Sequence, residues 1–199
     1  MINLIAPIII SLYGDSTMLG LECATPSTCH VTKNNVAYYL QDYIGDKAII
    51  NSDAFIGGTI KDLINGTGMF KEPFNDAIRK DNANVVIANF GINDSHLYNG
   101  AEYTYYLNQF IDIARANNKI PILEEPNPIC SSWSKQLDQF VIALDTVAKK
   151  RHVPVIAQYS YIRSIPAWQV FLGDCIHAKD HTLYAYKAMI EFRYLQSFL

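Results

Sequence analysis

The stretch Ile10-Ser11-Leu12-Tyr13-Gly14-Asp15-Ser16 runs from apolar residues directly into a glycine, an acid and a hydroxyl. Its apolar part has the length and character of a buried strand. Glycine permits backbone angles that end a strand abruptly, and Asp or Ser readily caps a following helix. Ser16 is therefore either an ordinary helix cap or a side chain displayed for chemistry. The rest of the chain decides between these interpretations.

Apolar runs of strand length recur along the chain, and they are continuous rather than alternating, as in strands buried on both faces of a parallel sheet. Segments with helical spacing separate them, and the longest carries one apolar stripe. The predicted strands are residues 5–12, 47–51, 84–90, 119–123 and 153–157. The predicted helices are residues 34–44, 72–80, 101–117, 132–151 and 182–198.

Strands that alternate with helices predict right-handed crossovers and helices on both faces of the sheet. We expect an α/β fold: a three-layer α/β/α sandwich with a flavodoxin-like five-stranded parallel sheet in the order 2-1-3-4-5. The 199 residues, of which 50% are hydrophobic and 18% charged, suit one domain spanning residues 1–199. In such a fold, ligands bind at the carboxyl ends of the strands.

Composition excludes several classes of protein. The net charge is −3, and no basic run exceeds Lys149-Lys150-Arg151, so we expect no nucleic-acid partner. No apolar run reaches the roughly 20 residues of a membrane helix. Met1-Ile2-Asn3 brings no positive charge, so we interpret the N-terminal apolar run as the first strand rather than a signal peptide. The sequence leaves the compartment open: the cytoplasm is the default, a virion is the alternative if the source is a bacteriophage, and export would need something outside this chain.

The four cysteines, Cys23, Cys29, Cys130 and Cys175, form no C-x-x-C pair, which argues against a zinc ribbon. Free buried thiols are the simplest expectation. Two disulfides stay open: Cys23 with Cys29 across a short loop, and Cys130 with Cys175 between two loops.

Polar residues follow the predicted strands. Acyl transfer through a serine needs a nucleophile, a base, an acid that orients the base, and donors for the developing oxyanion. Ser16 is the candidate nucleophile, His177 the base and Asp174 the orienting acid. The candidate oxyanion donors are the backbone N–H groups of Ser16 and Gly57 and the side-chain amide of Asn93. An amide donates without a charge that needs a partner, and a glycine N–H approaches a substrate closely.

In order and spacing, Gly14-Asp15-Ser16, Gly57, Gly91-x-Asn93-Asp94 and Asp174-x-x-His177 resemble the four blocks of the SGNH (GDSL-type) hydrolases. This resemblance implies a flavodoxin-like fold, a Ser-His-Asp triad with glycine and asparagine in the oxyanion hole, and esterase, lipase or carbohydrate-deacetylase activity without a cofactor. The chain departs from the family at Ala178, where proline often follows the histidine.

Three assignments have alternatives. Gly57 is preferred to Gly58 because the family's glycine typically lies two residues before a threonine, here Thr59. His177 is preferred to His181 because the segment that follows resembles the family's helix after the histidine. The two histidines have the spacing of a zinc pair, but no H-E-x-x-H motif or third ligand accompanies them, so we predict no metal.

The predicted function is a serine esterase that hydrolyses short acyl esters, with acetyl groups on a polysaccharide as the preferred substrate. The loops after the strands are short apart from residues 17–33 and 158–173, which favours an open cleft. Trp133, Trp168 and the 13 tyrosines would suit a glycan, although ordinary packing also explains them. The alternatives are a lipase or thioesterase on longer esters, and a non-catalytic flavodoxin-like binding module. The sequence leaves the oligomeric state open.

Overall fold

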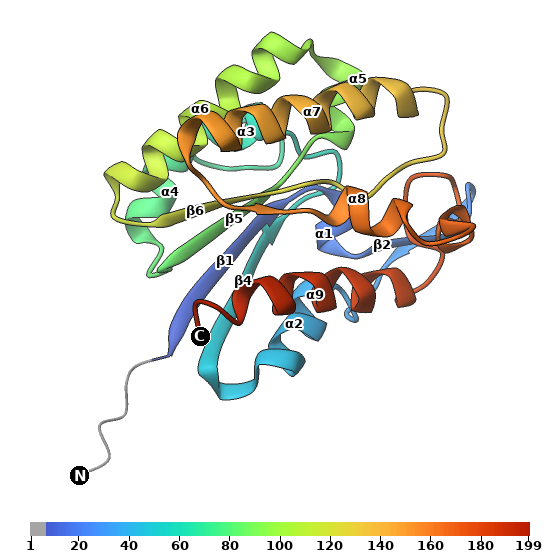
Figure 1. The fold of residues 1–199 in the computed structure, drawn as a ribbon, viewed down its shortest axis with the longest axis horizontal. Helices are drawn as coiled ribbons and strands as arrows, with labels where there is room; N and C mark the ends of the chain where they lie inside the picture. Colours follow the sequence, from blue (N-terminus) through green and yellow to red (C-terminus); the bar gives the residue numbers. More distant parts are fainter. Residues whose placement is uncertain (1–6) are drawn as a thin grey trace.

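A five-stranded parallel sheet in the order β4-β1-β5-β6-β7 forms the centre of the computed structural model, which describes residues 7–199 (Figure 1). Its strands are β1 (Ile8–Gly14), β4 (Ala48–Ala54), β5 (Val85–Asn89), β6 (Ile120–Glu124) and β7 (Val155–Ile156). All five predicted strands are present, although residues 5 and 6 of the first lie outside the described residues.

Counted among the sheet strands alone, the order is the expected 2-1-3-4-5. The topology of the whole chain differs in detail, because an antiparallel hairpin of β2 (Leu21–Thr25) and β3 (Thr28–Val31) lies between the first two sheet strands. The sequence pattern did not predict this hairpin, whose strands are short and largely exposed.

Helices cover both faces of the sheet, as Figure 1 shows. On one face α2 (Val36–Ile44) packs against α9 (Thr182–Leu195). On the other face lie α3 (Ile60–Asn65), α4 (Phe74–Lys80), α6 (Gly100–Ala116) and α7 (Ser134–Arg151). The shorter elements are α1 (Ser16–Leu19), α5 (Ile92–Leu97), α8 (Gln158–Arg163) and the 3₁₀ turns Gly45–Lys47 and Trp168–Phe171.

The sheet separates two hydrophobic cores. Ile10 and Leu12 of β1 point into the core under α2 and α9, whereas Tyr13 points into the core under α3, α4, α6 and α7. This two-sided burial explains why the central strands read as continuous apolar runs. The expectation that every strand is buried on both faces is wrong for β4, whose residues 51–53 are exposed. β4 is an edge strand with a neighbour on one side only.

The two longest predicted loops contain structure of their own. Residues 17–33 hold most of α1 and the whole hairpin, and residues 158–173 hold α8 and a 3₁₀ turn. Both segments follow the carboxyl ends of strands, at the edge of the sheet where Ser16 lies. The sequence had predicted them only as long loops. No helix within residues 7–199 is long and apolar enough to cross a membrane.

Candidate active site

Ser16 is the first residue of α1, directly after the end of β1. Asp15 caps this helix, because its Oδ1 accepts hydrogen bonds of 2.8 Å from both the N–H and the hydroxyl of Thr17. The tight turn requires Gly14, since a Cβ there would lie 2.7 Å from Cβ of Met18. Ser16 is therefore not the helix cap, and its hydroxyl is free for another partner.

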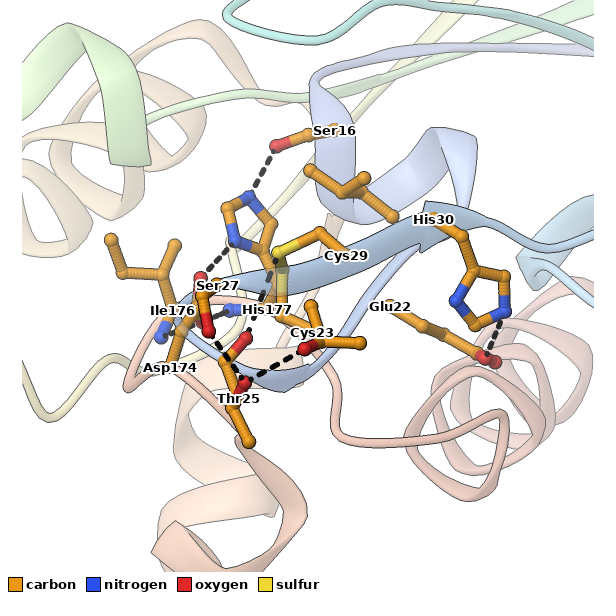
Figure 2. Close-up of a disulfide and its surroundings, with 12 residues drawn as sticks. Ser16, Glu22, Cys23, Thr25, Ser27, Cys29, His30, Asp174, Ile176 and His177 are labelled. Atoms are coloured by element: carbon orange, nitrogen blue, oxygen red, sulfur yellow. Dashed lines mark hydrogen bonds and ion pairs between the residues drawn. A yellow bond between two sulfur atoms is a disulfide. The ribbon is translucent and has the colours of Figure 1, made fainter.

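That partner is His177, which reaches Ser16 from the other end of the chain. The Oγ of Ser16 lies 2.9 Å from Nε2 of His177, and Nδ1 of the same ring lies 2.7 Å from Oδ2 of Asp174 (Figure 2). With the ring proton on Nδ1, the imidazole donates to Asp174 and accepts from the Ser16 hydroxyl. The structure thus brings the three residues into one hydrogen-bonded row.

Asp174 is held as a carboxylate acceptor. Its Oδ1 accepts the backbone N–H groups of Ile176 at 3.0 Å and His177 at 2.6 Å, while Oδ2 accepts from the ring. Burial alone would raise the pKa of Asp174, but the hydrogen bonds from His177 and Ile176 outweigh it, so the pKa lies below its ordinary value. A carboxylate that stays ionised fixes the orientation and tautomer of the ring.

The other candidate residues lie nearby in different roles. His181 precedes α9 and stacks on Tyr39, with 6.3 Å between ring centroids, so it does not take part in the row.

Asp94 is fully buried and its Oδ1 accepts the Ile60 N–H at 3.0 Å, which joins the loop after β4 to α5. Burial raises the pKa of Asp94 to about 8, although the Ile60 hydrogen bond opposes this. Asp94 braces the loop, as Asx side chains commonly do.

Gly57 and Gly58 lie in the turn that follows β4, and the structure distinguishes them. Gly58 is buried and donates its N–H to the Phe55 carbonyl at 3.1 Å. Gly57 is exposed with φ of 74°, and among the described residues no acceptor is recorded for its N–H. The Gly57 N–H is therefore the one free to meet a substrate oxygen.

Asn93 is tied to the same turn. Its Nδ2 donates to the Gly58 carbonyl at 3.0 Å, which leaves the second proton of the amide for another acceptor. Gly58 in turn packs on the end of β1, since a Cβ there would lie 3.2 Å from the Gly14 carbonyl. Contacts thus run without a break from Asn93 through Gly58 to the strand that presents Ser16.

All four cysteines are paired, which corrects the expectation of free thiols. Cys23 is bonded to Cys29 within the β2–β3 hairpin, and Cys130 is bonded to Cys175. The even number of cysteines was the available signal, together with the position of Cys175 between Asp174 and His177. Sequence alone cannot show which thiols approach one another.

One group of three potential metal ligands occurs within residues 7–199: Cys23, Asp174 and His177. The Cys23 sulfur is bonded to Cys29 and is not a thiolate, and the other two residues already bond to each other. This donor set does not fit a metal ion.

A second feature missed by sequence reasoning is a buried charge cluster beneath α1. The Nζ of Lys187 in α9 lies 3.4 Å from both the carbonyl and the hydroxyl of Thr17. Burial lowers the pKa of Lys187, although the charge of nearby Glu124 opposes this shift. Burial also raises the pKa values of the two carboxyl groups: that of Glu124 well above its ordinary value, and that of Glu191 to about 7. The amphipathic pattern of α9 gave no signal for the inward-facing Lys187 and Glu191, and Glu124 is the last residue of the apolar strand β6.

Comparison with known proteins identifies the family of the chain. The family model of GDSL-like lipases and acylhydrolases matches residues 12–181. The chain belongs to this GDSL-like family. The predicted resemblance is thereby confirmed, and the protein is a hydrolase of ester bonds. No curated protein matches its sequence.

Solved structures show the same fold for this GDSL-like hydrolase. The lipase/acylhydrolase from Enterococcus faecalis is 18% identical, with a TM-score of 0.79 over 96% of this chain and 97% of that one. The acetyl xylan esterase AlAXEase is 14% identical, with a TM-score of 0.77 over 94% and 100%. A carbohydrate acetylesterase family member from Sinorhizobium meliloti is 13% identical, with a TM-score of 0.74 over 96% and 98%.

Proposed function

We propose that the protein is a serine esterase that removes short acyl groups, acetyl above all, from a hydroxylated substrate such as a polysaccharide. The observation that carries the proposal is the hydrogen-bonded row of Ser16, His177 and Asp174, with distances of 2.9 and 2.7 Å. The row has the order of groups that activates a serine for acyl transfer.

The proposed mechanism proceeds through an acyl-enzyme. Oγ of Ser16 attacks the ester carbonyl while Nε2 of His177 takes its proton, and the imidazolium then donates that proton to the leaving alcohol. Water, deprotonated by the same ring, releases the acid and regenerates Ser16. Asp174 stabilises the imidazolium without itself accepting the proton.

Three N–H donors support the proposed oxyanion hole. The backbone N–H of Ser16 belongs to the first turn of α1, where N–H groups have no partner within the helix. The Gly57 N–H and the second amide proton of Asn93 complete the set. Donors held in place before the reaction stabilise developing charge without having to reorient.

Two observations favour a small acyl group on a large alcohol. Five well-formed cavities among residues 7–199, of about 300–410 Å³ each, are lined by neither Ser16 nor His177. None of these five would therefore receive a long acyl chain from an ester bound at Ser16. The exposed ring of His96, after β5, lies 4.6 Å from the partly buried ring of Trp133, after β6, and the outer face of His96 would meet a sugar ring. The acetyl xylan esterase and the carbohydrate acetylesterase among the structural relatives are consistent with this choice.

The test is a panel of esters of graded acyl length, including acetylated polysaccharides, offered to the wild type, to Ser16→Ala and to Ser27→Ala. Ser27 is an exposed serine of the nearby hairpin and serves as the matched control. We expect acetate release by the wild type and the control, and a loss of about 10⁴ to 10⁶ in kcat for Ser16→Ala.

Three results would overturn parts of this proposal. A rate that rises with acyl length up to long chains would make the protein a lipase or thioesterase instead. Undiminished hydrolysis by Ser16→Ala would exclude Ser16 as the nucleophile. A protein that hydrolyses no ester and is not labelled by a fluorophosphonate probe would be a binding module.

A further inference from the structure

Asp174 and His177 lie in a segment that belongs to no strand of the sheet. Residues 172–178, called here the histidine loop, follow α8 and a 3₁₀ turn and come well after the end of β7. Their side chains must nevertheless meet Ser16, which is fixed at the end of β1. What holds this loop in place therefore decides whether the row of hydrogen bonds forms.

On one side the histidine loop is fastened to the loop that follows β6. The Cys130–Cys175 disulfide joins the two, and the Cys130 N–H donates to the Cys175 carbonyl at 2.9 Å. Next to it, Nδ2 of Asn127 donates to the Ile176 carbonyl at 3.2 Å. These attachments fall on the two residues that separate Asp174 from His177.

On the other side the histidine loop rests on the hairpin. The Cys23 N–H donates to the Ala178 carbonyl at 2.8 Å, and Glu22 forms a parallel bridge with Ala178. A Cβ at Gly173 would lie 1.5 Å from the Cys23 carbonyl oxygen, so the two backbones are in close contact. Figure 2 shows the Cys23–Cys29 disulfide beside His177.

The residue that carries the Cys130–Cys175 bridge has an unfavourable backbone conformation. Cys175 has φ of 68°, in the left-handed region that favours glycine. This turn lets the N–H groups of both Ile176 and His177 point at Oδ1 of Asp174. Such a conformation persists only where its surroundings enforce it, and the disulfide lies at that residue.

We propose that Cys130 and Cys175 are a positioning pair for ester hydrolysis: their disulfide holds Asp174 and His177 in line with Ser16, so breaking it lowers kcat and leaves KM nearly unchanged. This inference rests on the proposed function. Reduction by a dithiol breaks the S–S bond; the dithiol supplies two electrons and two protons, yields two cysteine thiols and becomes a cyclic disulfide.

The experiment measures kcat and KM for an acetyl ester in the oxidised wild type, in Cys130→Ala/Cys175→Ala and in Cys23→Ala/Cys29→Ala. The first double variant should lose about 10- to 100-fold in kcat with KM within about twofold, because a displacement near 1 Å costs this much. Fluorophosphonate labelling should slow in proportion, since it needs His177 but no substrate cleft. The second double variant should lose less, because the β2–β3 ladder and the Cys23 N–H bond remain.

Two further measurements separate positioning from folding. Reducing the folded wild type well below its unfolding temperature should reproduce the loss, and reoxidation should restore kcat. The same treatment should slow Cys130→Ala/Cys175→Ala by no more than the smaller loss seen in Cys23→Ala/Cys29→Ala, because only the hairpin disulfide is left to reduce. Asn127→Ala, which leaves both disulfides intact, should also lower kcat without raising KM. These measurements decide the question even if the double variant does not fold.

Full kcat in the reduced wild type, equal losses in both double variants, or a rise in KM at constant kcat would overturn the inference. In each case the oxidised wild type would still hydrolyse esters and Ser16→Ala would not, so the proposed function would stand. Failure of the proposed function is a different result: the oxidised wild type then neither hydrolyses an ester nor reacts with fluorophosphonate.

Discussion

The two halves of the candidate site are held in different ways. Ser16, Gly57 and Asn93 follow β1, β4 and β5, neighbouring strands whose parallel register places their carboxyl ends side by side. His177 and Asp174 lie on the histidine loop, which is fixed by a disulfide, by Asn127 and by contact with the hairpin. The sheet therefore builds one half, and attachments between loops build the other.

This difference predicts how each half responds to change. Groups placed by the ends of buried strands should tolerate changes in distant loops, because the packed sheet keeps its geometry. Groups placed by a loop depend on a few contacts, so losing one contact should move the loop and affect the rate before it affects the fold. The following predictions test this contrast in order of decreasing effect.

Replacing Asp174 by asparagine tests the histidine half directly. The amide keeps the size of the side chain but removes the charge that stabilises the imidazolium, and it favours the wrong ring tautomer. We expect kcat to fall by about 10⁴ with little change in KM. Steady-state kinetics would measure this, with His181→Asn as the control because His181 stacks on Tyr39 outside the row. A larger loss in the control would mean that His181 is the base.

Replacing Asn93 by alanine tests the half built by the sheet. One proposed oxyanion donor disappears, together with the bond from Nδ2 to the Gly58 carbonyl. We expect kcat to fall by about 10² to 10³ while the unfolding temperature changes little. Kinetics and thermal unfolding of the same sample separate the two effects, and an unchanged rate would remove Asn93 from the oxyanion hole.

Gly173→Ala should push the histidine loop away from the hairpin, since the added Cβ would lie 1.5 Å from the Cys23 carbonyl oxygen. A displacement of His177 by about 1 Å should cost about 10²-fold in kcat. Gly100→Ala is the matched control, because a Cβ at the start of α6 meets no atom within 4 Å. Should the two variants be equally active, the close contact with the hairpin does not position the loop.

Asp94→Asn should change stability in a manner that depends on pH. The pKa of Asp94 is about 8 in the folded protein because of burial, whereas an unfolded aspartate titrates near pH 4. Between about pH 4 and 8 the unfolded state therefore binds fewer protons, and wild-type stability falls as pH rises. Asparagine does not titrate. The free energy of unfolding of the variant should therefore rise relative to that of the wild type, by up to about 1.4 kcal/mol per pH unit over this range.

Urea unfolding at pH 5 and pH 8 measures this gain, with Asp46→Asn as the control because Asp46 is exposed in the turn after α2. A difference between wild type and Asp94→Asn that stays constant with pH would contradict the titration of Asp94 in the folded state.

Much of the fold could be predicted from the sequence. The five strands and five long helices have strong periodic patterns, and each was found within a few residues of its observed bounds. The hairpin and the short helices α1, α3, α5 and α8 were missed. These elements are too short for a periodic signal, and tertiary contacts stabilise them. In the hairpin, for example, the backbone N–H of Cys23 donates a hydrogen bond to the carbonyl of Ala178, far along the chain.

The candidate residues were found because their chemistry is local. Gly14-Asp15-Ser16 and Asp174-x-x-His177 are recognisable as short motifs, and the alternation of strands and helices implies that the ends of β1, β4 and β5 meet. The support of the histidine loop was anticipated only as the open possibility of a Cys130–Cys175 disulfide. Cys130, Asn127 and Gly173 form no motif, because their partners are distant in sequence or depend on a close approach between backbones.

Sequence by itself determined which groups are available for the reaction and which strands bring most of them to one edge of a sheet, because strand pattern and residue chemistry are local properties. Only the tertiary structure decided that His177 rather than His181 meets Ser16, that Gly57 rather than Gly58 keeps a free N–H, and that the cysteines pair. Each of these depends on distances of a few ångströms between segments far apart in the chain, which packing fixes and no local pattern encodes.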